Sequence, residues 1–362
     1  GLGYRLLGQL AAAAERFESS SRLRQAIGDI RGQAASLRNL STVRSIQGDY
    51  AAAGAALTLA KSLVEPLGDP VAMADLANDV GVLAEEQGDY RGALDAYRDA
   101  LRLRQAQGNL REIGQSQINV GFAYYQLGEF DNAQTYWQQA MASYQQADDR
   151  IGMVHARESL ALSETASGAW TQARTSFDHI LVESESLQMA EERSIAQAGL
   201  AELDRLEGRM VSALDHAGNA MAAFRQREDA RGISEMTLLQ TAVLCDLGDW
   251  EQAASTLAAL SPENAASGEQ ASLYHWRKGE IALGQGQPDI ALGAADDAIA
   301  SASGQRNLGN ELAARLLRTR ALMSLKRTSE ALQELNTVRQ GRARYASVPF
   351  RPLQAETELQ VD

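Results

Sequence analysis

A glycine recurs every 40 residues along most of this chain, and no other feature constrains the fold as strongly. Each of these glycines is followed two positions later by a large apolar or aromatic residue and five positions later by an alanine. The seven glycines in register are Gly8, Gly48, Gly88, Gly128, Gly168, Gly208 and Gly248. Self-similarity with a period of about 20–50 residues is typical of a solenoid, in which one supersecondary unit stacks on the next.

Each column of the repeat has a steric explanation. The glycine is expected where one helix ends in a left-handed turn, which a side chain disfavours. The alanine is expected where two helices approach most closely, because a larger residue would push them apart. Half a period away, short polar residues precede apolar runs, where their side chains are expected to cap free backbone amides. These residues are Asp29, Asp69, Asn109, Asp149 and Asp229.

One copy of the repeat resembles the tetratricopeptide repeat family particularly well. Its matching residues are Gly121, Tyr124, Gly128, Phe130, Ala133, Trp137 and Ala140. The usual period of that family is about 34 residues. A period of 40 looks like the longer-helix variety found in kinesin light chains and bacterial signalling proteins. The resemblance implies an all-α fold, a right-handed superhelical solenoid of about eight antiparallel helical hairpins.

The repeat is regular over residues 1–260 and then changes. Pro262 is expected to cut short the second helix of its hairpin, which makes Ser261–Gly268 a longer loop. Residues 261–340 are expected to form two more divergent hairpins and residues 341–362 a C-terminal tail. Because the first residues match the motif from its middle onward, we expect the chain to be an excerpt of a longer protein.

Composition and charge exclude several classes of function. The net charge of −13 disfavours nucleic acid as a partner, because an acidic surface repels phosphate backbones. The sequence contains no apolar run long enough to insert into a membrane. Cys245 is the only cysteine, so the chain has no internal disulfide and no thiolate metal cluster. We expect a cytoplasmic protein, with a periplasmic sensor domain as the alternative.

The motifs of common enzyme classes are missing from the sequence. It has no phosphate-binding glycine loop with its lysine, no zinc-protease histidine pair and no nucleophile elbow. The four histidines lie on different hairpins without the close spacing of metal ligands. We therefore expect no catalytic activity, no cofactor and no metal site.

The resemblance implies that the first helix of each hairpin lines a concave groove. Asn39 and Asn119 match the asparagine with which this family often binds the backbone of an extended peptide, and Asp79 is a near match. Phe122 and Tyr125 are expected to be open rather than packed. The full set of expected groove residues is Arg38, Asn39, Asn78, Asp79, Gln115, Asn119, Phe122, Tyr125, Gln126, His155 and Glu158. Further along, Leu238, Leu239, Ala242 and Trp276 indicate either a second, apolar contact site or tight packing between hairpins.

These features predict a non-catalytic scaffold that binds a protein or peptide in the groove. The first hypothesis is the regulatory or sensor module of a larger bacterial signalling protein. The alternatives are a receptor for a small signalling peptide or metabolite and a free-standing assembly adaptor. Exposed solenoid ends would also allow a homodimer.

Overall fold

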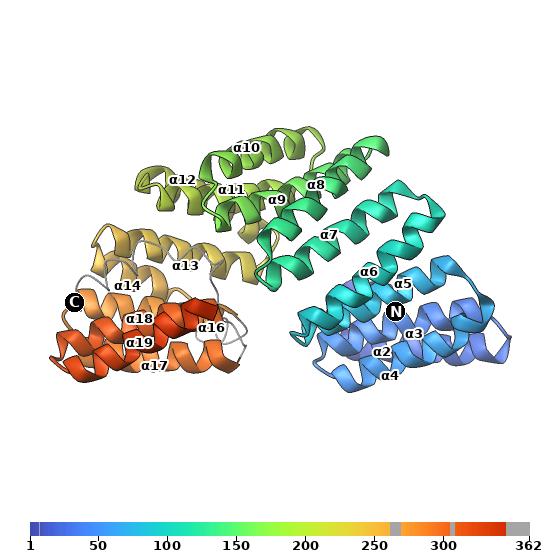
Figure 1. Cartoon of the computed structure of the whole chain (residues 1–362), viewed down its shortest axis with the longest axis horizontal. Coiled ribbons are helices and arrows are strands. Elements are labelled where there is room, and N and C mark those ends of the chain that lie inside the picture. Colours follow the sequence, from blue (N-terminus) through green and yellow to red (C-terminus); the bar gives the residue numbers. More distant parts are fainter. Residues whose placement is uncertain (7, 261–268, 305–307, 345–362) are drawn as a thin grey trace. The chain divides into compact units, whose positions relative to one another are not determined.

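The computed structural model describes residues 1–6, 8–260, 269–304 and 308–344, and every regular element among them is helical (Figure 1). The chain forms two compact units, Gly1–Ser159 and Leu160–Asp362, with their boundary inside helix α9. The all-α fold of stacked helical hairpins is confirmed.

Unit 1 begins with a short helix and then alternates first and second helices of successive hairpins. Neighbouring helices pack along their lengths, as α3 does on α4, α5 on α6 and α7 on α8. The elements are α1 (Leu2–Leu6), α2 (Leu10–Ala26), α3 (Ile30–Ile46), α4 (Tyr50–Val64), the 3-10 turn η1 (Glu65–Leu67), α5 (Pro70–Glu86), α6 (Tyr90–Gln107), α7 (Leu110–Gln126), α8 (Phe130–Gln146) and α9 (Arg150–Ala166).

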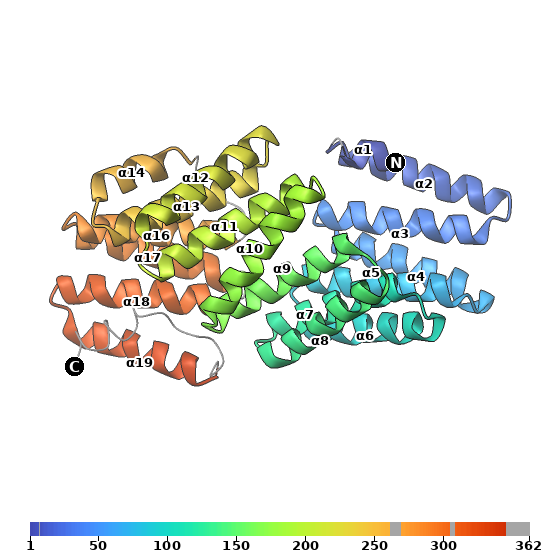
Figure 2. The same cartoon turned by 90° about the horizontal axis from the view of Figure 1, so that it is seen from above.

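Unit 2 continues the same alternation (Figure 2). Its elements after α9 are α10 (Trp170–Ser186), α11 (Ala190–Leu206), α12 (Met210–Gln226), α13 (Ala230–Asp246), α14 (Trp250–Ala258), α16 (Glu269–Gly284), α17 (Pro288–Gly304), α18 (Leu308–Ser324) and α19 (Thr328–Arg344). At nine residues α14 is half the length of most other helices, which confirms that this second helix is cut short.

The structure describes helices α16 to α19 of the divergent region but not the predicted loop before them. The predicted loop Ser261–Gly268 lies outside the described residues. Helix α19 runs on to Arg344, so residues 341–344 are helical and do not belong to a tail. Residues 345–362 lie outside the described part of the chain.

The glycine column has the backbone geometry expected of it. All seven glycines from Gly8 to Gly248 have φ between 68° and 80°, the left-handed region that L side chains rarely adopt. They end the first helices and start the turns within hairpins. Three non-glycine residues, Asp148, Gln188 and Glu228, adopt φ of 51–58° in the turns between hairpins.

Four of the five predicted helix caps are confirmed. Asp29, Asp69, Asp149 and Asp229 each accept a hydrogen bond from a backbone amide two or three residues later. The prediction for Asn109 is wrong, because its side chain caps no amide of α7. Aspartate carries a full negative charge toward the positive end of the helix dipole, which a neutral asparagine lacks.

The alanine column lies at the closest helix–helix contacts. All seven residues from Ala13 to Ala253 are 0% exposed, although they come from seven different hairpins. No space remains for a larger side chain between the paired helices. The alanines therefore set the spacing of each hairpin.

Replacing Ala133 by leucine is expected to destabilise the chain by about 1–3 kcal/mol, because the extra carbons overpack the contact between α7 and α8. Urea unfolding followed by circular dichroism measures the loss. Ala142 lies on the exposed side of the same helix, so Ala142→Leu is the matched control and should cost less than about 0.5 kcal/mol. Equal losses in the two variants would contradict a packing role for Ala133.

Two of the four apolar residues predicted as a contact site or as packing are now assigned to packing. Leu238 and Ala242 are buried in the core of unit 2, so they pack between helices. Leu239 and Trp276 are half-buried. Cys245 lies in the same core at 8% exposure, and burial raises the pKa of its thiol to about 12. At neutral pH it is an unreactive, small apolar residue.

Candidate functional site

A row of polar side chains crosses three consecutive first helices of unit 1. Arg38 Nε of α3 donates a hydrogen bond to the Asp79 carboxylate of α5. Asn119 Nδ2 of α7 donates to Asn78 Oδ1 of α5 at 2.7 Å, and Gln115 Nε2 donates to Asn119 Oδ1 at 3.1 Å. We call these five residues the polar row. The structure brings them together in two hydrogen-bonded sets that meet at adjacent residues of α5.

Asn39 and Asn119 differ in how their amides are held. Asn39 Nδ2 donates to the Ala35 carbonyl of its own helix at 2.8 Å, and its Oδ1 accepts no hydrogen bond from the described residues. Asn119 uses one donor and one acceptor within the polar row. Since a side-chain amide has two donors and two acceptor lone pairs, both residues keep capacity to bind a peptide group.

Tyr125 is half-buried, so its ring is less open than the sequence predicts. Its ring lies against Phe130 and Trp137 of α8, with ring centroids 5.3 and 5.9 Å apart. Phe130 is the large residue at the start of the second helix, and it offers the ring an edge-on partner at the turn. Phe122 is half-buried and therefore only partly open.

The remaining expected groove residues are Gln126 at the end of α7 and His155 and Glu158 on α9. All three are half-buried. The His155 backbone carbonyl accepts a hydrogen bond from Ser159 Oγ at 3.2 Å. The participation of these three side chains in binding stays a prediction.

The sequence reasoning missed an ion-pair network beside the polar row. Asp75 of α5 accepts from Arg38 Nη1 at 2.8 Å and lies 3.3 Å from Arg104 Nη2 of α6. The Arg104 side chain is only 8% exposed and also reaches Ser116 at 2.9 Å and Glu112 at 3.1 Å on α7. The network thus connects α3, α5, α6 and α7 and fixes the direction of the Arg38 side chain.

The repeat itself contained no clear signal for Arg104. At the equivalent position of other copies the chain has Arg24, Val64, Tyr144, Ser184 and Phe224, a mixture of charged, polar and apolar residues. A buried charged residue needs partners, but this column does not indicate that Arg104 is the buried one. The network became visible only in the structure.

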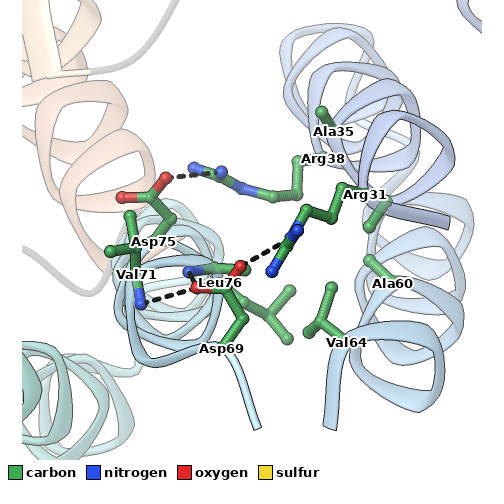
Figure 3. Close-up of a pocket in the computed structure, with 11 residues that line it drawn as sticks. Arg31, Ala35, Arg38, Ala60, Val64, Asp69, Val71, Asp75 and Leu76 are labelled. Atoms are coloured by element: carbon green, nitrogen blue, oxygen red, sulfur yellow. Dashed lines mark hydrogen bonds and ion pairs between the residues drawn. The ribbon is translucent and has the colours of Figure 1, made fainter. Parts of the chain in front are cut away.

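A small pocket of about 150 Å³ lies next to the network, between α3, α4 and α5 (Figure 3). Its walls include the apolar side chains of Ala60, Val64 and Leu76. Arg31 Nε pairs with Asp69 Oδ2 at 2.8 Å at one side of the pocket, and the Arg38–Asp75 pair stands at the other. The pocket is therefore apolar inside, with its flanking charges paired.

The C-terminal end of α5 is acidic. Tyr97 Oη donates to Glu85 Oε2 at 2.8 Å, and Ser45 Oγ donates to the carboxylate of Glu86. Burial raises the pKa of Glu85; the hydrogen bond from Tyr97 partly offsets this and the charge of Glu86 adds to it. Burial also raises the pKa of Glu86. A nearby cationic group would stabilise both carboxylates in their charged form.

One family model matches part of this chain. The model of the tetratricopeptide repeat matches residues 32–106, which include most of α3 and all of α4 and α5. This part of the chain is similar to the tetratricopeptide repeat family. Among solved structures, a tetratricopeptide repeat protein from Parabacteroides merdae is 17% identical, with a TM-score of 0.57. The match covers 80% of this chain and 98% of that one.

Two other solved structures are similar in fold over almost the whole chain. A Rap protein in complex with competence and sporulation factor is 13% identical, with a TM-score of 0.66 and coverage of 94% of this chain and 99% of that one. The quorum sensor NprR from B. thuringiensis, in its apo form, is 12% identical, with a TM-score of 0.59 and the same coverage. No curated protein matches the chain significantly.

The described residues contain no group of three or more His, Cys, Asp or Glu side chains placed to hold a metal ion. None of their helices is long and apolar enough to cross a membrane.

Proposed function

We propose that this chain is a non-catalytic scaffold that binds an extended segment of a protein or peptide along α3, α5 and α7. The observation that carries the proposal is the polar row, which places side-chain amides and charges on three successive first helices. Amides that both donate and accept can pair with peptide groups of any sequence.

The chemistry beside the polar row favours a ligand with neutral and basic residues. The Arg38 charge is already balanced by Asp75 and Asp79, so it offers little attraction for an acidic ligand. Glu85 and Glu86 lie on the same helix, α5, and favour a cationic group nearby. Steering of a basic segment toward an acidic protein is strongest at low ionic strength.

The Rap protein structure in complex with competence and sporulation factor supports binding of a small signalling ligand as the specific role. A Rap conjugation gene regulator of plasmid pLS20, solved with the Phr* peptide, has the same fold with 11% identity and a TM-score of 0.64. That match covers 92% of this chain and 97% of that one. A regulatory or sensor module of a bacterial signalling protein fits this fold, and an assembly adaptor is the second candidate.

The double substitution Asn39→Ala and Asn119→Ala is expected to weaken peptide binding about tenfold, because two hydrogen bonds to the ligand are lost at about 0.5–1.5 kcal/mol each. The probe is a peptide selected from a random twelve-residue library on the unmodified chain. Fluorescence anisotropy measures its Kd. Circular dichroism should show an unchanged melting temperature, since neither side chain is fully buried.

Asn132→Ala is the matched control, because Asn132 is exposed on the second helix α8 and bonds only to nearby Glu129. It should leave the Kd unchanged. If the double variant binds at full strength, the site lies away from α3 and α7. If the library yields no binder for the unmodified chain, peptide binding itself is contradicted.

A further inference from the structure

The last described hairpin, α18–α19, has a charge opposite to that of the rest of the chain. Between residues 308 and 344 the sequence has eight basic and three acidic residues, a net charge of +5. Since the whole chain has a net charge of −13, all other residues together contribute −18. The two helices pack side by side (Figure 2), so this positive charge is concentrated on one supersecondary unit.

The acidic residues of this hairpin are already used by internal ion pairs. Glu334 pairs with Arg315 at 2.6 Å and with Arg318 at 2.8 Å, and Glu311 pairs with Arg315 at 2.8 Å. These pairs hold the two helices together. Arg320 and Lys326 take part in none of the ion pairs found among the described residues.

The turn of this hairpin departs from the repeat at three adjacent positions. Earlier copies read glycine, then most often an acidic residue, then a large apolar or aromatic one, as in Gly248-Asp249-Trp250. Here the same turn reads Lys326-Arg327-Thr328. The hairpin closes in the same way, with the Lys326 amide bonded to the Met323 carbonyl at 2.9 Å. Packing therefore does not require these three different residues. They make a turn basic that is acidic and apolar in most earlier copies.

Lys326 adopts a backbone conformation that a side chain disfavours. Its φ is 59°, at the position where all seven regular copies have glycine. Non-glycine residues with strained backbone are common at functional sites, although Asp148, Gln188 and Glu228 adopt a similar φ in other turns of this chain. The Lys326 side chain is exposed. The Lys326 side chain is therefore accessible to a group outside the hairpin.

We propose that the α18–α19 turn, with Arg320, Lys326 and Arg327, is a docking surface for an acidic segment of a partner protein. Arg327 pairs with Glu330 at 2.6 Å, but both side chains are more than 40% exposed. Such pairs are weak and exchangeable, so a partner carboxylate can take the place of Glu330. This surface does not depend on the polar row or on the function proposed for it.

A short carboxylate-rich segment fits this surface better than a nucleic acid. A phosphate backbone would extend beyond the turn onto the acidic remainder of the chain and be repelled there. A segment of a few aspartate or glutamate residues covers the turn alone. Its binding should weaken steeply with salt, because the contacts are exposed charge pairs.

The test uses a fluorescein-labelled octaglutamate peptide and the whole chain at low salt. The unmodified chain should bind the peptide despite its net negative charge, and the double variant Lys326→Glu with Arg320→Glu should bind at least about tenfold more weakly. Lys61→Glu is the matched control, since Lys61 is an exposed lysine of α4, and it should leave the Kd unchanged.

A second variant, Lys326→Gly, separates charge from backbone strain. It should raise the urea midpoint, because glycine adopts a positive φ without strain, and it should still weaken octaglutamate binding. Unchanged binding in this variant would overturn the proposal, as would absence of octaglutamate binding to the unmodified chain. Tighter binding of an eight-nucleotide oligothymidylate would overturn it in favour of a nucleic-acid site. Salt-dependent dimerisation lost in the double variant would overturn it in favour of a second copy of the chain.

Discussion

Replacing Trp137 by alanine is expected to destabilise unit 1 by about 3–5 kcal/mol, one of the largest losses from a single substitution in this chain. Trp137 is 1% exposed, and its Nε1 donates to the Ile118 carbonyl at 3.0 Å. The indole lies where Gly121 of α7 leaves room for it, since a Cβ at Gly121 would clash with the ring. Gly121 has no side chain that could move into the cavity left by Trp137→Ala. Rearrangement of neighbouring side chains therefore recovers little of the lost packing energy.

Urea unfolding followed by far-ultraviolet circular dichroism is the measurement for Trp137→Ala. Repeat arrays can unfold in stages, so the comparison uses the transition that shifts between the unmodified chain and the variant. Trp137→Phe serves as the conservative control, because it retains most of the buried ring, and should lose clearly less. A loss below about 1 kcal/mol for Trp137→Ala would show that this position is not part of the packed core.

Replacing Asp204 by alanine is expected to destabilise unit 2 by about 2–3 kcal/mol. The Asp204 side chain is 1% exposed and accepts from Arg174 at 2.6 Å, Arg209 at 2.8 Å and His216 at 2.8 Å. Without the carboxylate these groups lose their common partner. The expected loss is smaller than that for a fully buried pair, because Arg174, Arg209 and His216 remain 28–45% exposed and can be hydrated.

The contribution of Asp204 should depend on pH. Burial acts to raise its pKa, but the hydrogen bonds from His216, Arg209 and Arg174 outweigh burial and hold the pKa below its ordinary value of 3.8. A carboxyl group whose pKa is lowered by folding stabilises the fold above its ordinary pKa and loses this effect as the pH falls through the lowered value. The stability difference between the unmodified chain and Asp204→Ala should therefore be full at neutral pH and shrink below about pH 4.

Denaturant titrations at several pH values between about 7 and 3 measure this difference. Asp215→Ala is the matched control, because Asp215 is exposed on the neighbouring helix α12 and should contribute little at any pH. A stability difference that stayed constant on acidification would mean that the Asp204 charge is not what stabilises this cluster.

The regular part of the fold could be predicted from the sequence because its causes are local. A left-handed turn favours glycine, a helix N-terminus favours aspartate and a close helix contact favours alanine, and each preference recurs in phase. The glycine φ values and the fully buried alanines confirm these predictions. Asn109 shows the limit, since a residue type suited to capping does not ensure that the cap forms.

The residues of the polar row could also be singled out from the sequence, because motif positions place them on successive first helices. The hydrogen bonds between these side chains could not be predicted from the sequence. The Arg38–Asp79 and Asn119–Asn78 bonds join residues 41 positions apart. Whether such side chains meet depends on how one hairpin lies on the next, to within an ångström. Tyr125 illustrates this, since its motif position indicated an open ring, and the start of α8 covers part of it.

The sequence by itself therefore determined the repeat, the helices and their turns, because each follows from steric rules that act within one hairpin. The tertiary structure alone decided which charges are paired. It balanced Arg38 with Asp75 and Asp79, buried Arg104 between hairpins and left Lys326 exposed in a strained turn. Charge pairing depends on distances between hairpins, and these distances are set by packing across the repeat rather than by the residues within one copy.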